Sequence, residues 1–167
     1  MNRAVLIGSQ VVIALLALGV RFAAPGWWLI IVFMTIGFVA LAILAPLILA
    51  TTLTAVFAPA LRPRTLIALC VADIALLTFA STLPDFTDVS DQYPVSLAAL
   101  ATGEAEVSRQ AMDVFSAIAG YALPVYAAAA LVTIVLAVLD HRRARRVPVG
   151  PRPGEFGAPA VWEGAVR

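Results

Sequence analysis

The 167-residue chain lacks lysine altogether, has one cysteine and one histidine, and carries few charges of either sign. Charged side chains make up 13% of the residues, about half the share of a typical soluble domain. Apolar side chains make up 62%, and the mean hydropathy is +0.99. The low charge excludes an ordinary water-soluble globule, and the high apolar content excludes a mostly disordered chain. The composition therefore predicts an integral membrane protein.

The scarcity of reactive side chains limits the chemistry further. Cys70 has no second cysteine for an intrachain disulfide or a metal site. The chain has no glycine-rich phosphate loop, no GxSxG motif and no HExxH motif, and its one histidine, His141, lies in a basic cluster. We therefore expect no catalytic residues, no cofactor and no bound metal.

The positive charge is concentrated near the C-terminus. Residues 1–139 carry five arginines and seven acidic residues, a net charge of −2, whereas residues 140–167 carry six arginines and three acidic residues, a net charge of +3. A basic tail of this kind is not a nucleic-acid-reading surface, so we expect no nucleic-acid partner. The absence of lysine together with 33 alanines indicates a G+C-rich bacterial genome.

Four segments have about the 20 mostly apolar residues that a helix needs to cross a bilayer. They are residues 4–20, 27–50, 65–83 and 116–139. We predict an all-α integral membrane bundle of these four helices, with residues 1–139 forming the membrane domain. The first segment is interpreted as a span and not as a cleaved signal peptide, because its apolar run is longer than such peptides have and Pro25 follows its small-residue site.

The second apolar region is difficult to divide. From Trp27 to Leu61 it has 35 uncharged residues, too many for one helix and barely enough for two. Pro46 and Pro59 interrupt its second half. We place one span up to about residue 50 and an interfacial stretch over residues 52–60, and leave open whether that stretch dips into the membrane.

The arginines decide the expected orientation. Four spans with the N-terminus inside place on the cytoplasmic side Arg3, Arg62, Arg64, Arg142, Arg143, Arg145 and Arg146. The long outer loop, residues 84–113, then carries a net charge of −5, as the positive-inside rule favours. We expect a multi-pass protein of a bacterial inner membrane with both termini in the cytoplasm. Residues 140–167 are expected to form a disordered, basic, Pro/Gly-rich tail.

Two short helices are expected within the outer loop. Val95–Thr102 is followed by Gly103, a typical C-terminal glycine of a helix. Glu104–Met112 has acidic residues near its start, as the helix dipole favours, and we expect it to continue into the fourth span.

Asp73 is the most informative single residue, because it lies near the middle of the third span. A charged carboxylate there costs about 2.5–3.5 kcal/mol, so we expect Asp73 to face the bundle interior in a protonated or hydrogen-bonded form. A rise of about 1.5 Å per residue places Asp73 about 12 Å, and Gln10 and Thr133 about 9 Å, from the inner ends of their helices. The three side chains are thus candidates for one polar layer. Such a layer has two interpretations: a site that handles protons or cations, or neutral hydrogen bonds that join the helices and contribute about 1 kcal/mol. Because the spans contain a single acidic residue, the second interpretation is favoured.

Each charged cluster outside the spans, one acidic and one basic, has two interpretations. Asp85, Asp88 and Asp91 of the outer loop could attract a divalent cation, but their order is not that of an EF-hand, and a solvated acidic surface is the simpler reading. The other cluster comprises Arg142, Arg143, Arg145 and Arg146. These arginines could bind anionic lipid at about 1 kcal/mol per charge, or they could only fix the topology.

The packing features favour a protein that acts by association. Ala4 and Gly8 form a small-xxx-small pair, and Ala127–Ala130 allow close approach of helix backbones. We expect a subunit of a larger membrane complex or a homo-oligomer, with the lipid bilayer, other membrane subunits or its own copies as partners. The alternative is a small permease or a proton- or cation-conducting protein that uses Asp73. A lipid-modifying enzyme with a metal at the acidic loop is a third, less favoured reading.

Overall fold

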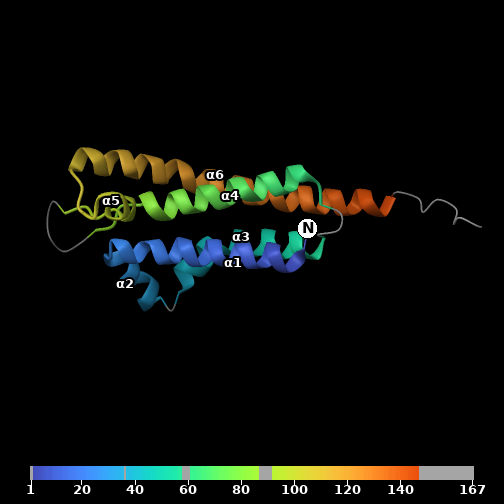
Figure 1. Ribbon diagram of the computed structural model, residues 1–167, viewed down its shortest axis with the longest axis horizontal. Coiled ribbons are helices and arrows are strands. Elements are labelled where there is room, and N and C mark those ends of the chain that lie inside the picture. The colour runs from blue at the N-terminus through green and yellow to red at the C-terminus, as the bar shows by residue number, and fades with distance from the viewer. Residues whose placement is uncertain (1, 36, 58–60, 87–91, 147–167) are drawn as a thin grey trace, which may run out of the picture.

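The computed structural model describes residues 2–35, 37–57, 61–86 and 92–146. Within these ranges the chain forms six α-helices, one 3-10 helix and no sheet (Figure 1). The elements are α1 (Arg3–Gly19), η1 (Val20–Ala23), α2 (Trp27–Met34), α3 (Phe38–Val56), α4 (Pro63–Thr82), α5 (Ser96–Thr102) and α6 (Arg109–Arg146). The predicted all-α class is confirmed.

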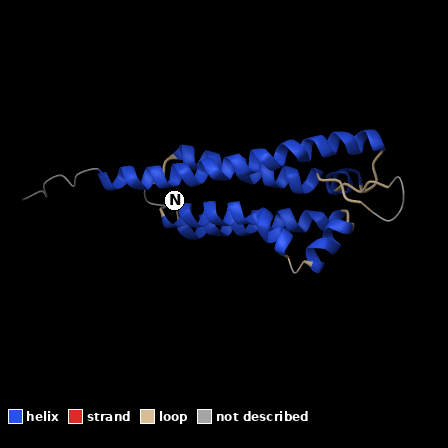
Figure 2. Ribbon diagram, turned by 180° about the vertical axis from the view of Figure 1, so that it is seen from behind, coloured by secondary structure: helices blue, strands red, loops and turns tan. Residues whose placement is uncertain are grey.

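Four of these helical segments are long and apolar enough to cross a membrane. They are Arg3–Ala23, Phe38–Val56, Pro63–Thr82 and Arg109–Arg145. The segments run along the long axis of the molecule, and the start of α1 and the end of α6 lie toward the same end (Figures 1 and 2). The predicted number of candidate spans is therefore confirmed.

The structure divides the predicted 27–50 span in two. Helix α2 has eight residues and is about 12 Å long, too short to cross a bilayer. Gly37 then adopts a left-handed φ of +76°, which a residue without Cβ takes without strain, and the spanning helix starts at Phe38. Helix α3 continues to Val56, so the first part of the expected interfacial stretch is helical, and residues 58–60 lie outside the described residues.

The outer loop also differs in part from its prediction. The short helix before Gly103 is present as α5, and Gly103 has the expected left-handed φ of +81°. The predicted helix over Glu104–Met112 begins only at Arg109. Glu106 instead forms an isolated bridge with Pro94, so the backbone before α6 pairs with the loop before α5.

The start of the predicted tail is helical. Helix α6 runs through the arginine cluster to Arg146 instead of ending at residue 139. The predicted disorder of the tail concerns residues 147–167, which lie outside the described residues.

The most extensive helix contact is between α4 and α6. The buried residues of α6 recur every three or four positions and are mostly small: Ala119, Ala122, Tyr126, Ala129, Ala130, Thr133, Ala137 and Asp140. Against them α4 buries Leu69, Ala72 and Leu76. Small side chains let two helix backbones approach closely, which is how helices gain packing energy in lipid. The core of the bundle is therefore an alanine-rich seam between α4 and α6, closed from the other side by α1 and α3.

A tyrosine from α6 compensates for the proline inside α3. Pro46 has no N–H and crowds the turn before it, which weakens the helix there. The Tyr126 hydroxyl accepts a hydrogen bond from the Leu47 N–H at 3.1 Å and donates one to the Ile43 carbonyl at 2.8 Å. In a regular α-helix the Leu47 N–H would donate directly to the Ile43 carbonyl, four residues earlier. Tyr126 thus bridges the turn at the proline, as neighbouring helices do in membranes.

Replacing this hydroxyl tests the bridge. We expect Tyr126→Phe to lower the free energy of unfolding by about 1–3 kcal/mol, because two buried backbone groups lose their partner. Thermal unfolding in detergent measures the loss. Tyr121→Phe is the matched control, since Tyr121 lies on the same helix and is 77% exposed. Equal stability of the two variants would mean that α3 does not depend on Tyr126.

Candidate functional site

A hydrogen bond between Gln10 and Asp73 joins α1 to α4 inside the apolar part of the bundle. Gln10 Nε2 donates to Asp73 Oδ2 at 2.8 Å, and Gln10 is buried while Asp73 is half-buried. Two of the four side-chain polar atoms, Gln10 Oε1 and Asp73 Oδ1, are buried without a hydrogen-bond partner. The two residues placed at similar depth by the sequence therefore do meet, and they leave two acceptor oxygens unpaired.

The third member of the expected polar layer does not join this pair. Thr133 is fully buried, but its hydroxyl donates to the Ala129 carbonyl on its own helix at 2.8 Å. A threonine inside a helix commonly satisfies itself in this way. The layer is thus a pair of residues, Gln10 and Asp73.

A proton or a small cation would satisfy the unpaired oxygens of Gln10 and Asp73. A proton on Asp73 would turn one unpaired acceptor into a donor, and Gln10 Oε1 is an acceptor that could receive it. The pair would then be a neutral acid–amide contact, which the hydrocarbon phase favours over a bare carboxylate. A small cation that binds oxygen ligands would also satisfy both oxygens.

A buried carboxylate that was not predicted as a site residue fastens the end of the bundle where α1 begins and α6 ends. Asp140 of α6 is 2% exposed and accepts hydrogen bonds from the Arg62 N–H at 3.1 Å and the Thr65 hydroxyl at 2.7 Å. Arg64 Nη2 donates to its other oxygen at 2.6 Å. Asp140 thereby binds the first turn of α4, where Pro63 starts the helix. The sequence signal was an acidic residue directly between an apolar span and an arginine cluster.

The opposite end of the bundle is fastened by a second buried carboxylate. Arg21 Nη2 lies 2.8 Å from Asp85 Oδ2, with side chains 10% and 0% exposed. Asp85 Oδ1 also accepts hydrogen bonds from the backbone N–H groups of Trp28 and Phe86, at 3.0 and 2.9 Å. Gly26 lies against this carboxyl group, and a Cβ there would collide with it. The contact joins the end of the first span to the chain after α4.

The expectation of an exposed acidic loop is therefore corrected at Asp85. That residue is 3% exposed and its oxygens are engaged by Arg21 and backbone N–H groups, so it is neither solvated nor free to bind a cation. Asp88 and Asp91 lie outside the described residues. Among the residues that the structure describes, no group of three or more His, Cys, Asp or Glu side chains is placed to hold a metal ion.

The arginine cluster lies on the last turns of α6. Arg142, Arg143 and Arg145 are exposed, and Arg146 is the final residue of the helix. At the start of the cluster, the His141 ring stacks on Phe57 at 4.1 Å between centroids, which connects α6 to the end of α3. The cluster thus extends as charged helix beyond the Asp140 contact.

Comparisons of the chain with protein-family models, with curated proteins and with solved structures found no match.

Truncating Asp140 tests its contact with the start of α4. We expect Asp140→Ala to lower the free energy of unfolding by about 1–3 kcal/mol, because the buried Thr65 hydroxyl and the Arg62 N–H lose their acceptor. Chemical or thermal unfolding in detergent measures this. Asp113→Ala, an exposed acidic residue on the same helix, is the matched control and should change stability little. An unfolding free energy that is the same for both variants would contradict a fastening role for Asp140.

Proposed function

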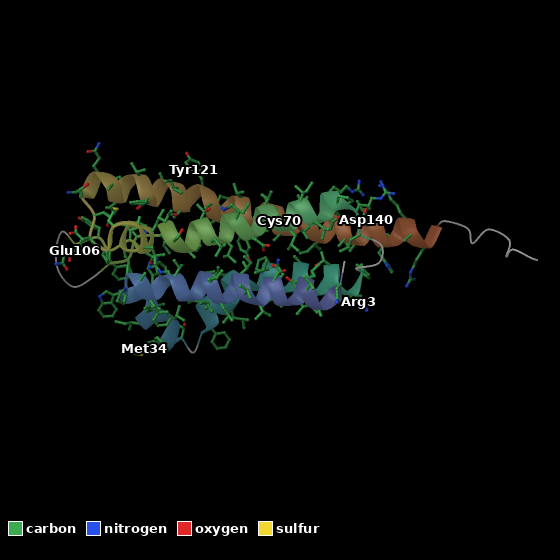
Figure 3. All side chains as sticks on the ribbon, viewed as in Figure 1. Arg3, Met34, Cys70, Glu106, Tyr121 and Asp140 are labelled. Carbon is green, nitrogen blue, oxygen red and sulfur yellow. The ribbon has the colours of Figure 1, made fainter. Side chains whose placement is uncertain are left out.

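We propose that the chain is a four-span protein of a bacterial inner membrane with both termini in the cytoplasm. Arg3 and Asp140 lie toward one end of the bundle and Glu106 lies at the other (Figure 3). Among the arginines that the structure describes, Arg21 and Arg109 belong to the Glu106 end, and the others lie on elements near the Arg3 and Asp140 end. A membrane protein retains its arginine-rich loops on the cytoplasmic side, which supports this orientation.

We propose further that the protein acts by association, binding transmembrane helices of partner subunits or of its own copies. The observation that carries the proposal is an exposed face of α1 with small residues on it. Of its 17 residues, only Leu6, Gln10 and Ala17 are buried. A Cβ added at Gly8 would meet no atom within 4 Å, and Ala4 on the same face is exposed.

The exposed face of α1 suits close helix packing. Neighbouring positions on it are large and apolar, and Val12 and Leu15 are 54% and 62% exposed. Small residues flanked by apolar ones let a second helix approach closely, where van der Waals contact and not the hydrophobic effect holds helices together. This face of α1 is therefore well suited to bind another helix.

Filling the small position tests the association. We expect Gly8→Ile to reduce the stoichiometric complex seen by native mass spectrometry of mildly solubilised membranes about tenfold, the effect of losing about 1.4 kcal/mol of packing. Ala42→Ile is the matched control, because Ala42 is a small exposed residue on α3. A wild-type protein recovered as a lone monomer, or a complex unaffected by Gly8→Ile, would contradict the proposal.

A second candidate function is proton or cation conduction, and the unpaired oxygens of Gln10 and Asp73 favour it. Unpaired buried acceptors on two residues that are hydrogen-bonded to each other suit a transferable proton or a small cation. Asp73 lies next to the exposed Cys70 and Ile74 face of α4, so its site is near the bundle surface. If the protein acts by association, the Gln10–Asp73 hydrogen bond only joins α1 to α4. Substitution of Asp73 distinguishes this structural role from conduction.

The separating variant is Asp73→Asn. Asparagine has nearly the same shape, keeps an oxygen for Gln10 Nε2 and has no carboxyl group to ionise, so we expect unchanged thermal stability and an unchanged complex. Asp73→Leu removes both contacts and should lower stability by about 1 kcal/mol. If wild-type proteoliposomes carry a proton or cation flux that Asp73→Asn abolishes while abundance is kept, conduction replaces association as the function.

A further inference from the structure

The last turns of helix α6 extend past the other spanning helices (Figure 1). Two contacts mark the level at which those helices end. Asp140 binds the Thr65 hydroxyl in the first turn of α4, and the next residue, His141, stacks on Phe57 directly after α3. Helix α4 has 20 residues and is about 30 Å long, which matches the thickness of the hydrocarbon core. In the proposed four-span arrangement, on which this inference rests, Asp140 therefore lies at the boundary of that core.

Three exposed arginines follow this boundary. Arg142, Arg143 and Arg145 lie two to five residues beyond Asp140 on the same helix, a distance of about 3–8 Å along its axis. A bilayer is about 40–45 Å thick with its headgroups and about 30 Å without them, so each headgroup layer is about 5–8 Å deep. Side chains on a helix lean toward its N-terminus, which here is the direction of the membrane. The three guanidinium groups therefore lie at the depth of the lipid phosphates.

The fold does not use these three positive charges. The part of the chain that the structure describes places no carboxylate in ion-pair contact with them, in contrast to Arg62 and Arg64, which pair with Asp140. Asp140 is the one acidic residue described at this end of the bundle, and its side chain is buried. Together these five arginines and one carboxylate have a net charge of +4. The end of the bundle thus carries positive charge that no described side chain neutralises.

The depth and the charge together define the ligand. A planar guanidinium binds phosphate through paired N–H donors, and at this depth the phosphates belong to membrane phospholipids. A zwitterionic headgroup also carries an ammonium group, which the arginines repel. An anionic headgroup has no such group and is attracted by each arginine. A net negative glycerophospholipid is therefore the ligand that fits.

We propose that Arg142, Arg143 and Arg145 bind the phosphates of anionic glycerophospholipids in the leaflet that surrounds the end of α6. Residues three positions apart share a face of a helix, so Arg142 and Arg145 form one pair of donors. By the same rule Arg143 lies one turn beyond Asp140, on the face that α4 contacts. The arginines thereby select a class of lipid, which goes beyond fixing the topology of the chain.

Lipid titration of the purified, delipidated full chain in mild detergent tests the proposal. The probes are phosphatidylglycerol and phosphatidylethanolamine with identical acyl chains, and native mass spectrometry counts the bound lipid. We expect the wild-type chain to bind phosphatidylglycerol about a hundredfold more tightly, about fivefold for each of the three charges. Equal binding of the two lipids would overturn the proposal, and this comparison needs no variant that might misfold.

Removing the charges assigns the preference to these residues. We expect the combined variant Arg142→Gln, Arg143→Gln and Arg145→Gln to lose most of the preference for phosphatidylglycerol. The combined variant Arg142→Lys, Arg143→Lys and Arg145→Lys keeps the charge and should retain most of it. A preference that the glutamine variant retains would overturn the proposal.

Arg109→Gln is the matched control for the loss of a charge. Arg109 is exposed at the other end of α6, about 46 Å before Asp140, and so lies beyond the opposite headgroup layer. Its replacement should leave the preference unchanged, and a loss as large as that of Arg142→Gln alone would contradict the assignment. Binding by purified protein does not depend on orientation in the cell. Failure of the lipid preference is therefore distinguishable from failure of the four-span arrangement.

Discussion

The apolar surroundings of a membrane bundle impose one constraint from which the rest follows: a polar group that leaves water has to be paired inside the protein. Helix α4 is the element where most of these pairings meet. Asp73 in its middle binds Gln10 of α1, and Thr65 at its start binds Asp140 of α6. The carbonyls at its end bind Arg21. These contacts fix the first candidate span, Arg3–Ala23, and α6 against α4 at three levels of the bundle, and Tyr126 fixes α6 against α3.

The same requirement draws attention to the buried polar atoms that have no hydrogen-bond partner. Asp85 and Asp140 are engaged on both oxygens, so they hold the fold together and have little left for chemistry. The unpaired atoms are Gln10 Oε1, Asp73 Oδ1, Arg21 Nε and the Ser96 hydroxyl oxygen, among the residues that the structure describes. The first two carry the choice between structural glue and conduction.

The length of the apolar runs and the fixed rise per residue of a helix made the spans and the Gln10–Asp73 contact predictable from the sequence. The four candidate spans follow from runs of apolar residues, and the depth of Gln10 and Asp73 along their helices was enough to bring them together. The break at Gly37 was not predictable, because the chain is equally apolar on both sides of it and only the left-handed backbone marks it. The burial of Asp85 was missed because its partner Arg21 lies 64 positions earlier and meets it only when α1 and α4 pack. Thr133 is buried but does not join the pair, because its hydroxyl bonds to a carbonyl of its own helix.

Labelling of single cysteines with a membrane-impermeant maleimide tests the central claim most directly, namely four spans with both termini on the cytoplasmic side. In a Cys70→Ser background, cysteines at the exposed positions Asn2, Thr102 and Arg142 report on the two ends of the bundle. The four-span arrangement predicts that Thr102→Cys is labelled in intact cells, whereas Asn2→Cys and Arg142→Cys are labelled only after the membrane is permeabilised. Labelling of Asn2→Cys and Arg142→Cys from opposite sides would contradict it.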